Sequence, residues 1–279
     1  MPLDSGLPKC DIPIYFINLD DEEKRKSHIK KKLKRFGLSA TRVSAVDARE
    51  ISLKSCPNFQ PNSYQNDRWE IDDFSKAVFE SHRLVWKSVC KAGHPFAVIL
   101  EDDLMFNNDF GKVLSLLGNF IEEFDIIRLN TFSQTKCFKN TQILCEGLHV
   151  RLILQSIADA GAYFITQAAC QKLLQNSQSY CDHVDDYIFS PKRKLRTFQL
   201  VHPVCGQFIH QPEIANKMEQ EGITISTRIS SRTESMLPAK GPFLFRLKKE
   251  ILRFYNKYRL QILVQNKKAV NERCSILKF

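Results

Sequence analysis

Pro95-Phe-Ala-Val-Ile-Leu-Glu-Asp-Asp103 is the stretch that decides the fold class of this 279-residue chain. Its apolar part, Pro95 to Leu100, shows no polar alternation, which is typical of a strand buried on both faces of a parallel sheet. Glu101, Asp102 and Asp103 follow at once, and open α/β sheets bind their ligands outside the carboxyl ends of such strands. The stretch therefore predicts a core strand that ends at a ligand site.

Strand and helix patterns alternate on both sides of this stretch. The expected strands span residues 12–19, 42–46, 95–100, 124–129 and 161–166, and the expected helices span 20–35, 74–89, 110–121 and 167–175. Two of these helices run up to a glycine, Gly37 and Gly93, that suits a helix C-cap. Residues 50–73 lack periodicity and predict a long surface loop. This alternation predicts an α/β fold with a mainly parallel central sheet.

The charge of the chain is concentrated near its carboxyl end. The formal net charge is +10, and residues 240–279 alone carry eleven basic and two acidic side chains. The body is therefore nearly neutral, and it shows no mixed aromatic and basic platform for nucleic acid. We expect no nucleic-acid partner.

Cysteine usage and hydropathy favour a reduced compartment. The nine cysteines form no CxxC pair, and no N-x-[ST] sequon occurs. We therefore expect reduced thiols rather than a disulfide framework. The most apolar runs are strand-sized and too short to span a membrane. The expected location is the cytoplasm.

The three carboxylates after Leu100 indicate a cation site. Carboxylates this close repel one another unless a cation compensates them, and Mn²⁺ or Mg²⁺ is held by one or two carboxylates together with phosphate oxygens. The alternative is an acidic strand-to-helix turn in which Asp102 or Asp103 caps a helix.

Six motifs in chain order carry a family resemblance. They are Ile17-Asn-Leu-Asp20 with Arg25, Ser44-Ala-Val-Asp-Ala48, Ser81-His-Arg-Leu-Val-Trp86, Val98-Ile-Leu-Glu-Asp-Asp103, Gly161-Ala-Tyr-Phe-Ile165 and Val184-Asp-Asp186. Together they resemble glycosyltransferase family 25, the family of lipooligosaccharide galactosyltransferases that also includes procollagen galactosyltransferases. The similarity spans roughly residues 12–230.

The resemblance implies a GT-A-like catalytic domain, expected over residues 10–235, and a basic C-terminal segment over 236–279. It implies a UDP-sugar donor, Mn²⁺ or Mg²⁺ dependence and inversion at the anomeric carbon. The acceptor would be an oligosaccharide or lipid-linked glycan. Galactose is the expected hexose, and glucose differs from it at one hydroxyl that the sequence does not resolve. A catalytically silent sugar-binding module on the same fold is the competing interpretation.

The resemblance also places site residues. Those expected near the donor are Asn18, Arg25, Ser81, His82, Asp102, Gly161 and Gln207, with Ser226 and Thr227 as further candidates on the nucleotide side. Those expected at the metal are Glu101, Asp103 and His202, with His210 as the alternative to His202. The competing interpretations are structural: Asn18 ends a strand, Arg25 pairs with a carboxylate or is a solvated helix residue, and His82 is an interior histidine.

Inversion needs a carboxylate that takes the proton of the acceptor hydroxyl while the nucleotide leaves. The pair Asp185 and Asp186 is the expected source of this base. Asp159 is the rival, and it could instead hold hydroxyls of the donor sugar. The alternative for the pair is a helix cap.

The C-terminal segment contains an amphipathic helical pattern. Its apolar residues recur at steps of three and four and comprise Leu244, Leu247, Ile251, Phe254, Tyr258 and Ile262. Basic residues fall mostly off that stripe, which suits peripheral contact with the anionic inner face of the cytoplasmic membrane. The alternatives are that the stripe packs on the catalytic domain or forms a homodimer contact.

Overall fold

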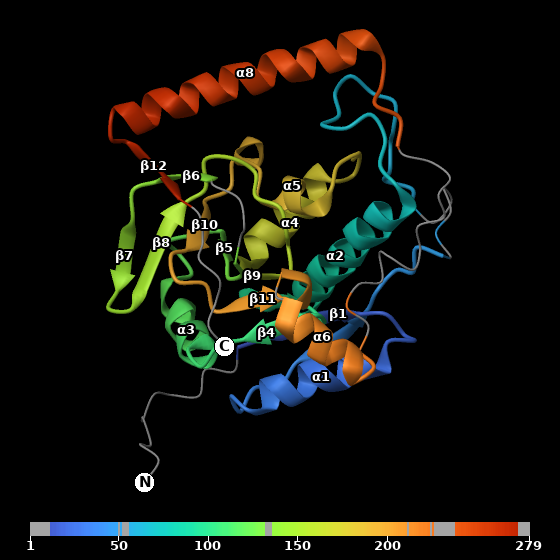
Figure 1. Cartoon of the computed structure of the whole chain (residues 1–279), viewed down its shortest axis with the longest axis vertical. Helices are drawn as coiled ribbons and strands as arrows, with labels where there is room; N and C mark the ends of the chain where they lie inside the picture. The colour runs from blue at the N-terminus through green and yellow to red at the C-terminus, as the bar shows by residue number, and fades with distance from the viewer. Residues whose placement is uncertain are drawn as a thin grey trace.

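A computed structural model describes residues 12–49, 51, 56–131, 136–210, 212–223, 225 and 238–272. Its centre is an eight-stranded sheet in the order β2-β1-β3-β9-β5-β10-β8-β7, with helices packed on both faces (Figure 1). The strands of this sheet are β1 Ile14–Asn18, β2 Thr41–Ser44, β3 Phe96–Glu101, β5 Ile126–Arg128, β7 Gln142–Cys145, β8 Leu148–Leu152, β9 Ala162–Thr166 and β10 Thr197–Leu200.

The remaining elements flank this sheet. Two small sheets pair β4 (Leu104–Phe106) with β11 (Cys205–Gln207), and β6 (Lys136–Lys139) with β12 (Ala269–Glu272). The helices are α1 Glu23–Lys34, α2 Asp73–Ala92, α3 Phe110–Leu117, α4 Gln167–Asn176, α5 Val184–Ile188, α6 Pro212–Gln220 and α8 Phe243–Gln265. Short 3₁₀ turns lie at η2 Gly118–Phe120, η3 Pro191–Arg193 and η4 Phe208–His210.

Strand direction confirms the predicted α/β fold and adds two reversed strands. β1 lies parallel to both β2 and β3, and β5 lies parallel to β10. β9 sits between β3 and β5 and runs antiparallel to both, while β8 is antiparallel to β10 and β7. In the described sheet β8 and β9 thus run against the other six strands.

Alternation along the central strands separates two cores. Ile14 and Phe16 of β1 face the core that α1 and α3 cover, while Tyr15 and Ile17 face the core under α2, α4 and α5. This is the period of two that a strand imposes on its side chains. The same alternation in β9 turns Tyr163 toward α2. The central strands β1, β3 and β9 are therefore buried on both faces, as their apolar sequences predict.

Local signals mark the start of α2 and the ends of α1 and α2. The carboxylate of Asp72 accepts a hydrogen bond from the backbone N–H of Ser75 at 2.7 Å and begins α2. The predicted C-cap of α2, Gly93, has a left-handed φ of 70°, and Gly37 after α1 has φ 69°. The C-cap of α2 is the predicted Gly93, whereas that of α1 is Arg35, and the helices span 23–34 and 73–92 rather than 20–35 and 74–89. Ser81 and His82 thus lie in the buried middle of α2.

The predicted loop between residues 50 and 73 lies against the start of α5. Within its described part, the backbone N–H of Gln60 donates to Tyr180 O at 2.9 Å, and that of Arg68 donates to Cys181 O at 3.1 Å. The Arg68 side chain also pairs with Asp186, with Nη2 to Oδ2 at 2.5 Å. The loop is thus tied to the segment that carries the predicted base.

The C-terminal helix α8 runs along one end of the molecule (Figure 1). It is anchored by Phe245, whose ring centroid lies 5.2 Å from that of Trp69, and by β12, which pairs with β6. The predicted apolar stripe does not pack on the body, because its six side chains are between 37% and 70% exposed. The packing alternative is therefore wrong for this stripe.

Two further findings bear on the sequence expectations. No helix in the described ranges is both long and apolar enough to cross a membrane. Seven cysteines fall within those ranges, and each has a free thiol.

Candidate functional site

A pocket of about 560 Å³ opens at the carboxyl ends of β1 and β3. Ten of the thirteen predicted site residues line it: Asn18, Arg25, Ser81, His82, Glu101, Asp102, Asp103, Asp159, Asp185 and Gln207. They come from β1, α1, α2, β3, α5 and β11 and from the loops that follow β3 and precede β9. The position is the one that ligands take in open α/β sheets.

Glu101 and Asp103 converge on one side chain from a different strand. Gln207 Nε2 donates to Glu101 Oε2 at 2.7 Å and to Asp103 Oδ1 at 3.4 Å. Gln207 reaches them because β11 pairs with β4, with Gln207 opposite Leu104. The pKa of Glu101 is raised to about 8, chiefly by burial and then by the neighbouring carboxylate of Asp103. Two carboxylates that share one Gln207 amide leave a place where a cation would be stabilised.

Asp102 turns away from this pair. Its carboxylate accepts from Asn18 Nδ2 at 2.7 Å and pairs with Arg25 Nη2 at 2.7 Å. Burial raises the pKa of Asp102 to about 7, although Arg25 opposes the shift. Asn18 also donates to Glu22 O and accepts from Arg42 Nε, at 3.0 and 2.8 Å. Asn18, Arg25 and Asp102 thus hold one another in the pocket lining, and their contact with the nucleotide stays a prediction.

Ser81 is also engaged within the protein. Its hydroxyl donates to Ala77 O at 2.7 Å and accepts from the backbone N–H of Val46 at 2.9 Å. Ser81 lines the pocket and ties the segment after β2 to α2, while its contact with the donor stays a prediction.

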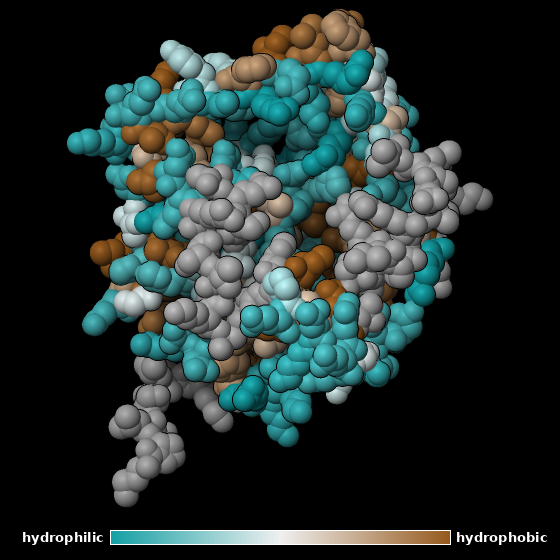
Figure 2. Space-filling view, viewed as in Figure 1, coloured by the Kyte–Doolittle hydropathy of each residue, from teal (hydrophilic) through white to brown (hydrophobic). Residues whose placement is uncertain are grey.

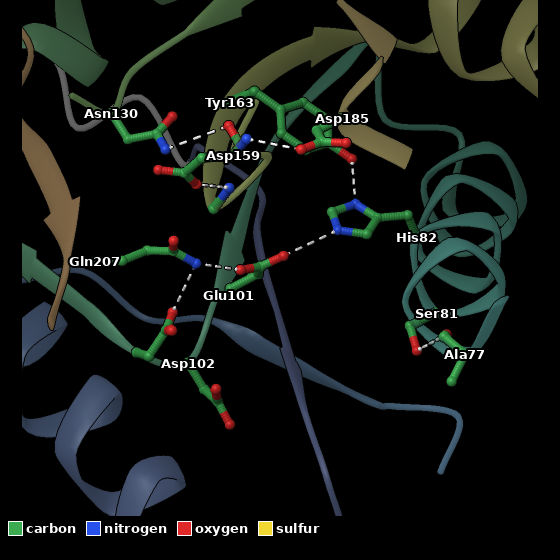
Figure 3. A network of polar contacts seen from close by, with 12 residues as sticks. Ala77, Ser81, His82, Glu101, Asp102, Asn130, Asp159, Tyr163, Asp185 and Gln207 are labelled. Atoms are coloured by element: carbon green, nitrogen blue, oxygen red, sulfur yellow. Dashed lines mark hydrogen bonds and ion pairs between the residues drawn. The ribbon is translucent and has the colours of Figure 1, made fainter. Parts of the chain in front are cut away.

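His82 is fully buried and connects the pocket to the core. Its Nδ1 lies 2.8 Å from Tyr163 Oη and its Nε2 lies 3.4 Å from Glu101 Oε1. Burial lowers the pKa of His82 to about 3, so the ring is neutral. In Figure 3, Glu101 lies between His82 on one side and Gln207 on the other. His82 therefore contacts Glu101, a predicted metal ligand, and its contact with the donor stays a prediction.

The structure separates the two candidate bases. Asp185 lines the pocket, and its Oδ2 accepts from the backbone N–H of Asp159 at 2.9 Å. Asp186 points to Arg68 and is absent from the described lining. Of the pair, Asp185 alone is placed to meet a substrate.

Asp159 is held in an unusual conformation by a residue that the sequence analysis missed. Asp159 has a left-handed φ of 76°, and its backbone oxygen accepts from Arg128 Nε at 3.0 Å. Arg128 is fully buried and also donates to Ala158 O at 3.0 Å. A charged residue inside the apolar run 124–129 was the signal available for it.

Gly161 acts through its missing side chain. Asp159 Oδ1 accepts from its backbone N–H at 2.8 Å. A Cβ at position 161 would lie 2.9 Å from that oxygen and 3.3 Å from Gln207 Cγ. The glycine therefore lets Asp159 and Gln207 approach the chain, although Gly161 is not in the described lining.

His202 is not brought to the site. It is exposed in the loop after β10, and its ring centroid lies 6.2 Å from that of His149. The described lining does not contain it, so the structure does not bring His202 to Glu101 and Asp103. The side chain of its alternative, His210, lies outside the part that the structure describes, as do Ser226 and Thr227.

The described lining is strongly acidic. It contains eight carboxylates against two guanidinium groups, and these two, Arg25 and Arg49, already pair with aspartates. Such a surface repels an anionic ligand unless a cation comes with it. Next to the acids lie apolar side chains from β1 and the start of α2: Ile17, Phe74, Ala77 and Val78.

Known proteins resemble this chain in sequence. It is 24% identical over 165 residues to the lacto-N-neotetraose biosynthesis glycosyltransferase LgtE of Neisseria meningitidis serogroup B, covering 54% of this chain and 59% of that protein. It is 23% identical over 165 residues to the lipooligosaccharide biosynthesis protein lic2B of Haemophilus influenzae, covering 57% and 61%. The match thus spans about three fifths of the length of these relatives.

Solved structures resemble it more distantly. An apo UDP-glucose pyrophosphorylase aligns with a TM-score of 0.40 and 10% identity, covering 76% of this chain and 99% of that one. This likeness is too remote to support a functional conclusion.

The family comparison is more extensive. The profile described as glycosyltransferase family 25 (LPS biosynthesis protein) matches residues 11–188, which is more than half of the chain. Of the site candidates, only His202, Gln207, His210, Ser226 and Thr227 lie outside the matched residues. The chain therefore belongs to glycosyltransferase family 25.

Proposed function

We propose that this chain transfers a hexose, with galactose preferred, from a UDP-sugar to a lipooligosaccharide-type glycan acceptor, with inversion at the anomeric carbon. The observation that carries the proposal is the pocket at the strand ends, where Glu101 and Asp103 converge and Asp185 also lies in the lining. The family description and the names of the two relatives support a glycan acceptor.

Asp185 is the proposed base. It would accept the proton of the acceptor hydroxyl as that oxygen attacks the anomeric carbon and the bond to UDP breaks. Two backbone N–H groups fix its carboxylate: Asp159 N donates to Oδ2 at 2.9 Å and Asp186 N donates to Oδ1 at 2.8 Å. A base held on both oxygens is oriented before the substrates arrive.

Mn²⁺ or Mg²⁺ is the proposed cofactor. In the described ranges no three His, Cys, Asp or Glu side chains converge to form a complete metal cage. Two carboxylates do converge, and the hard divalent ions need no more than one or two when substrate phosphates supply further oxygens. The acidic lining fits this arrangement. When bound, the ion would neutralise charge on the diphosphate, with Glu101 and Asp103 as its protein ligands.

A donor screen tests the proposal. The purified chain is incubated with UDP-galactose, UDP-glucose and UDP-N-acetylglucosamine, with and without Mn²⁺, and released UDP is measured. We expect release to be fastest with UDP-galactose and to need the ion. A faster reaction with UDP-glucose would change the assigned sugar, while binding of every donor without turnover would favour the silent sugar-binding module.

We also propose that α8 lies on an anionic lipid surface and so brings the enzyme to a lipid-linked acceptor. Phe254 and Tyr258 lie on the opposite side of the helix from Phe245, which is buried against Trp69. The exposed stripe therefore faces away from the body, and Figure 2 shows apolar residues along the edge that α8 occupies.

The charge of α8 suits such a surface. The helix carries six basic residues and one acidic residue, Glu250. By the helical repeat, Lys248 and Arg259 flank the stripe on one side, and Arg246, Arg253 and Lys257 flank it on the other. Each basic residue near an anionic membrane contributes about 1 kcal/mol at modest salt. A second copy of the chain would bring like charges together, so lipid is the favoured occupant.

Vesicle sedimentation measures this contact. Full-length protein should bind phosphatidylglycerol vesicles, bind phosphatidylcholine vesicles weakly, and dissociate as salt rises. Changing Phe254 and Tyr258 to Ser should weaken binding at least about tenfold, because each buried aromatic contributes roughly 1.5–3 kcal/mol. Point variants are preferable to deletion, since β12 pairs with β6 and its removal would disturb the body.

The matched control is Ile143→Ser, which removes another exposed apolar side chain, 66% accessible on β7. It should bind vesicles like the unchanged protein. Binding that ignores lipid charge and salt would contradict the proposal, and a dimer that the α8 substitutions dissociate would assign the stripe to a second copy.

A further inference from the structure

A chain of hydrogen bonds runs from the buried core to the pocket. Trp86 Nε1 donates to Tyr163 Oη at 3.0 Å, Tyr163 Oη lies 2.8 Å from His82 Nδ1, and His82 Nε2 lies 3.4 Å from Glu101 Oε1. The first three residues are fully buried, and Glu101 reaches the pocket. Neither the family motifs nor the proposed reaction assigns a task to Trp86 or Tyr163.

The donor and acceptor properties of these groups fix the direction of each hydrogen bond in the series. An indole N–H only donates, so Tyr163 Oη accepts from Trp86. Burial raises the pKa of Tyr163 well above its usual value, so its hydroxyl keeps its proton. Among the hydrogen bonds placed on Tyr163 in the described structure, His82 Nδ1 is the partner that can accept that proton. Nδ1 is then an acceptor, and the ring proton lies on Nε2.

The opposite tautomer would break the chain at both ends. With the proton on Nδ1, the buried Tyr163 hydroxyl would lose its acceptor, and Nε2 could no longer donate to Glu101 Oε1. A buried polar group left without its partner is destabilising. The surroundings therefore select the Nε2–H form.

We infer that Tyr163, oriented by Trp86, holds His82 as an Nε2–H donor that fixes the carboxylate of Glu101 in the pocket. Glu101 is then held at both oxygens, by His82 at Oε1 and by Gln207 at Oε2. Tyr163 and His82 are positioning residues, since neither needs to touch the donor. The effect on catalysis rests on the proposed function, whereas the tautomer does not.

Nitrogen NMR tests the tautomer without any substrate. Long-range ¹H–¹⁵N correlation of the labelled full chain distinguishes Nε2–H from Nδ1–H, and the His82→Gln spectrum identifies the His82 signals among the seven histidines. We expect a neutral Nε2–H ring. An Nδ1–H or charged ring would overturn the inference, whatever the enzyme proves to transfer.

Tyr163→Phe tests the consequence. The Nδ1 signal should move toward that of an unbonded ring nitrogen, and kcat should fall about 10- to 100-fold, the usual scale for a residue that orients a metal ligand. Tyr187→Phe is the matched control, because it removes another buried tyrosine hydroxyl, which donates to Leu173 O at 3.4 Å. Tyr187→Phe should leave both the His82 Nδ1 signal and kcat unchanged. Equal losses of kcat in the two variants would show that the Tyr163 hydroxyl contributes only to packing.

The two amide replacements of His82 give a second readout that does not depend on Tyr163. A Gln amide can reach the position of Nε2, whereas an Asn amide reaches only that of Nδ1. His82→Gln should therefore keep roughly tenfold more kcat than His82→Asn. A higher kcat in His82→Asn than in His82→Gln would mean that the bond to Tyr163 matters more than the bond to Glu101. That result would contradict a role for His82 in holding Glu101.

Discussion

Asp185→Asn is expected to lower sugar transfer by roughly 10² to 10⁴, the usual contribution of a positioned general base. The amide cannot accept the proton of the acceptor hydroxyl, yet it has nearly the same shape as the carboxylate. Binding of UDP, measured by calorimetry, should change little, because the substitution affects the proton transfer and not the nucleotide. NMR of the product should show an inverted anomeric centre.

Asp186→Asn is the control for this change. Its carboxylate pairs with Arg68 outside the described lining, so transfer should fall no more than a few-fold. A large loss in Asp186→Asn with little in Asp185→Asn would reverse the assignment. If both variants remain active, Asp159 becomes the candidate, and product with retained configuration would refute the single displacement.

Asp103→Asn, like removal of divalent ions by EDTA, is expected to lower kcat by at least about 10². Neutralising the departing diphosphate is a matter of several kcal/mol, and 1.36 kcal/mol corresponds to a factor of ten. The fold should survive, since the Oδ2 of Asp103 lies 3.3 Å from Arg25, a longer contact than the one Asp102 makes. Thermal unfolding should therefore show a nearly unchanged Tm. Full activity in excess EDTA would exclude the ion-dependent scheme.

Asp102→Asn, in contrast to Asp103→Asn, should lower stability more than it lowers kcat. It removes one partner of a buried ion pair whose arginine cannot lose its charge, which costs about 3 kcal/mol of unfolding free energy. We expect denaturant unfolding to show this loss of stability, with kcat per folded molecule reduced less than in Asp103→Asn. Asp102 would thus contribute mainly to stability, and Asp103 mainly to catalysis.

The sequence predicted the long elements of this fold because their patterns are local. The apolar run before Glu101 and the left-handed glycines after α1 and α2 each depend on a few adjacent residues. The short strands β4, β6, β7, β8, β10 and β11 were not predicted, since three to five residues carry too little periodicity. The antiparallel course of β9 was also missed, because strand direction depends on the connection and not on the strand's own residues.

At the site, the residue types were easier to predict than their orientations. The motifs predicted that Glu101, Asp103 and Asp185 share one pocket, but they did not distinguish these residues from their neighbours. Asp102 pairs with Arg25 within the lining, and Asp186 pairs with Arg68 outside it. Their directions depend on Arg25 and Arg68, each far away in the chain. Arg128 and Tyr163 act through contacts across the sheet that no local spacing records.

The late position of β9 in the chain bears on how the protein is made. β9 lies between β3 and β5, yet the ribosome completes both neighbours well before residues 162–166 emerge. Until then, the fully buried strand residues Ala97 to Leu100 would present an apolar edge with open hydrogen-bonding groups. Nascent chains that stop short of Thr166 should therefore be prone to aggregation and dependent on chaperones. Early release during synthesis would be more hazardous before this strand than after it.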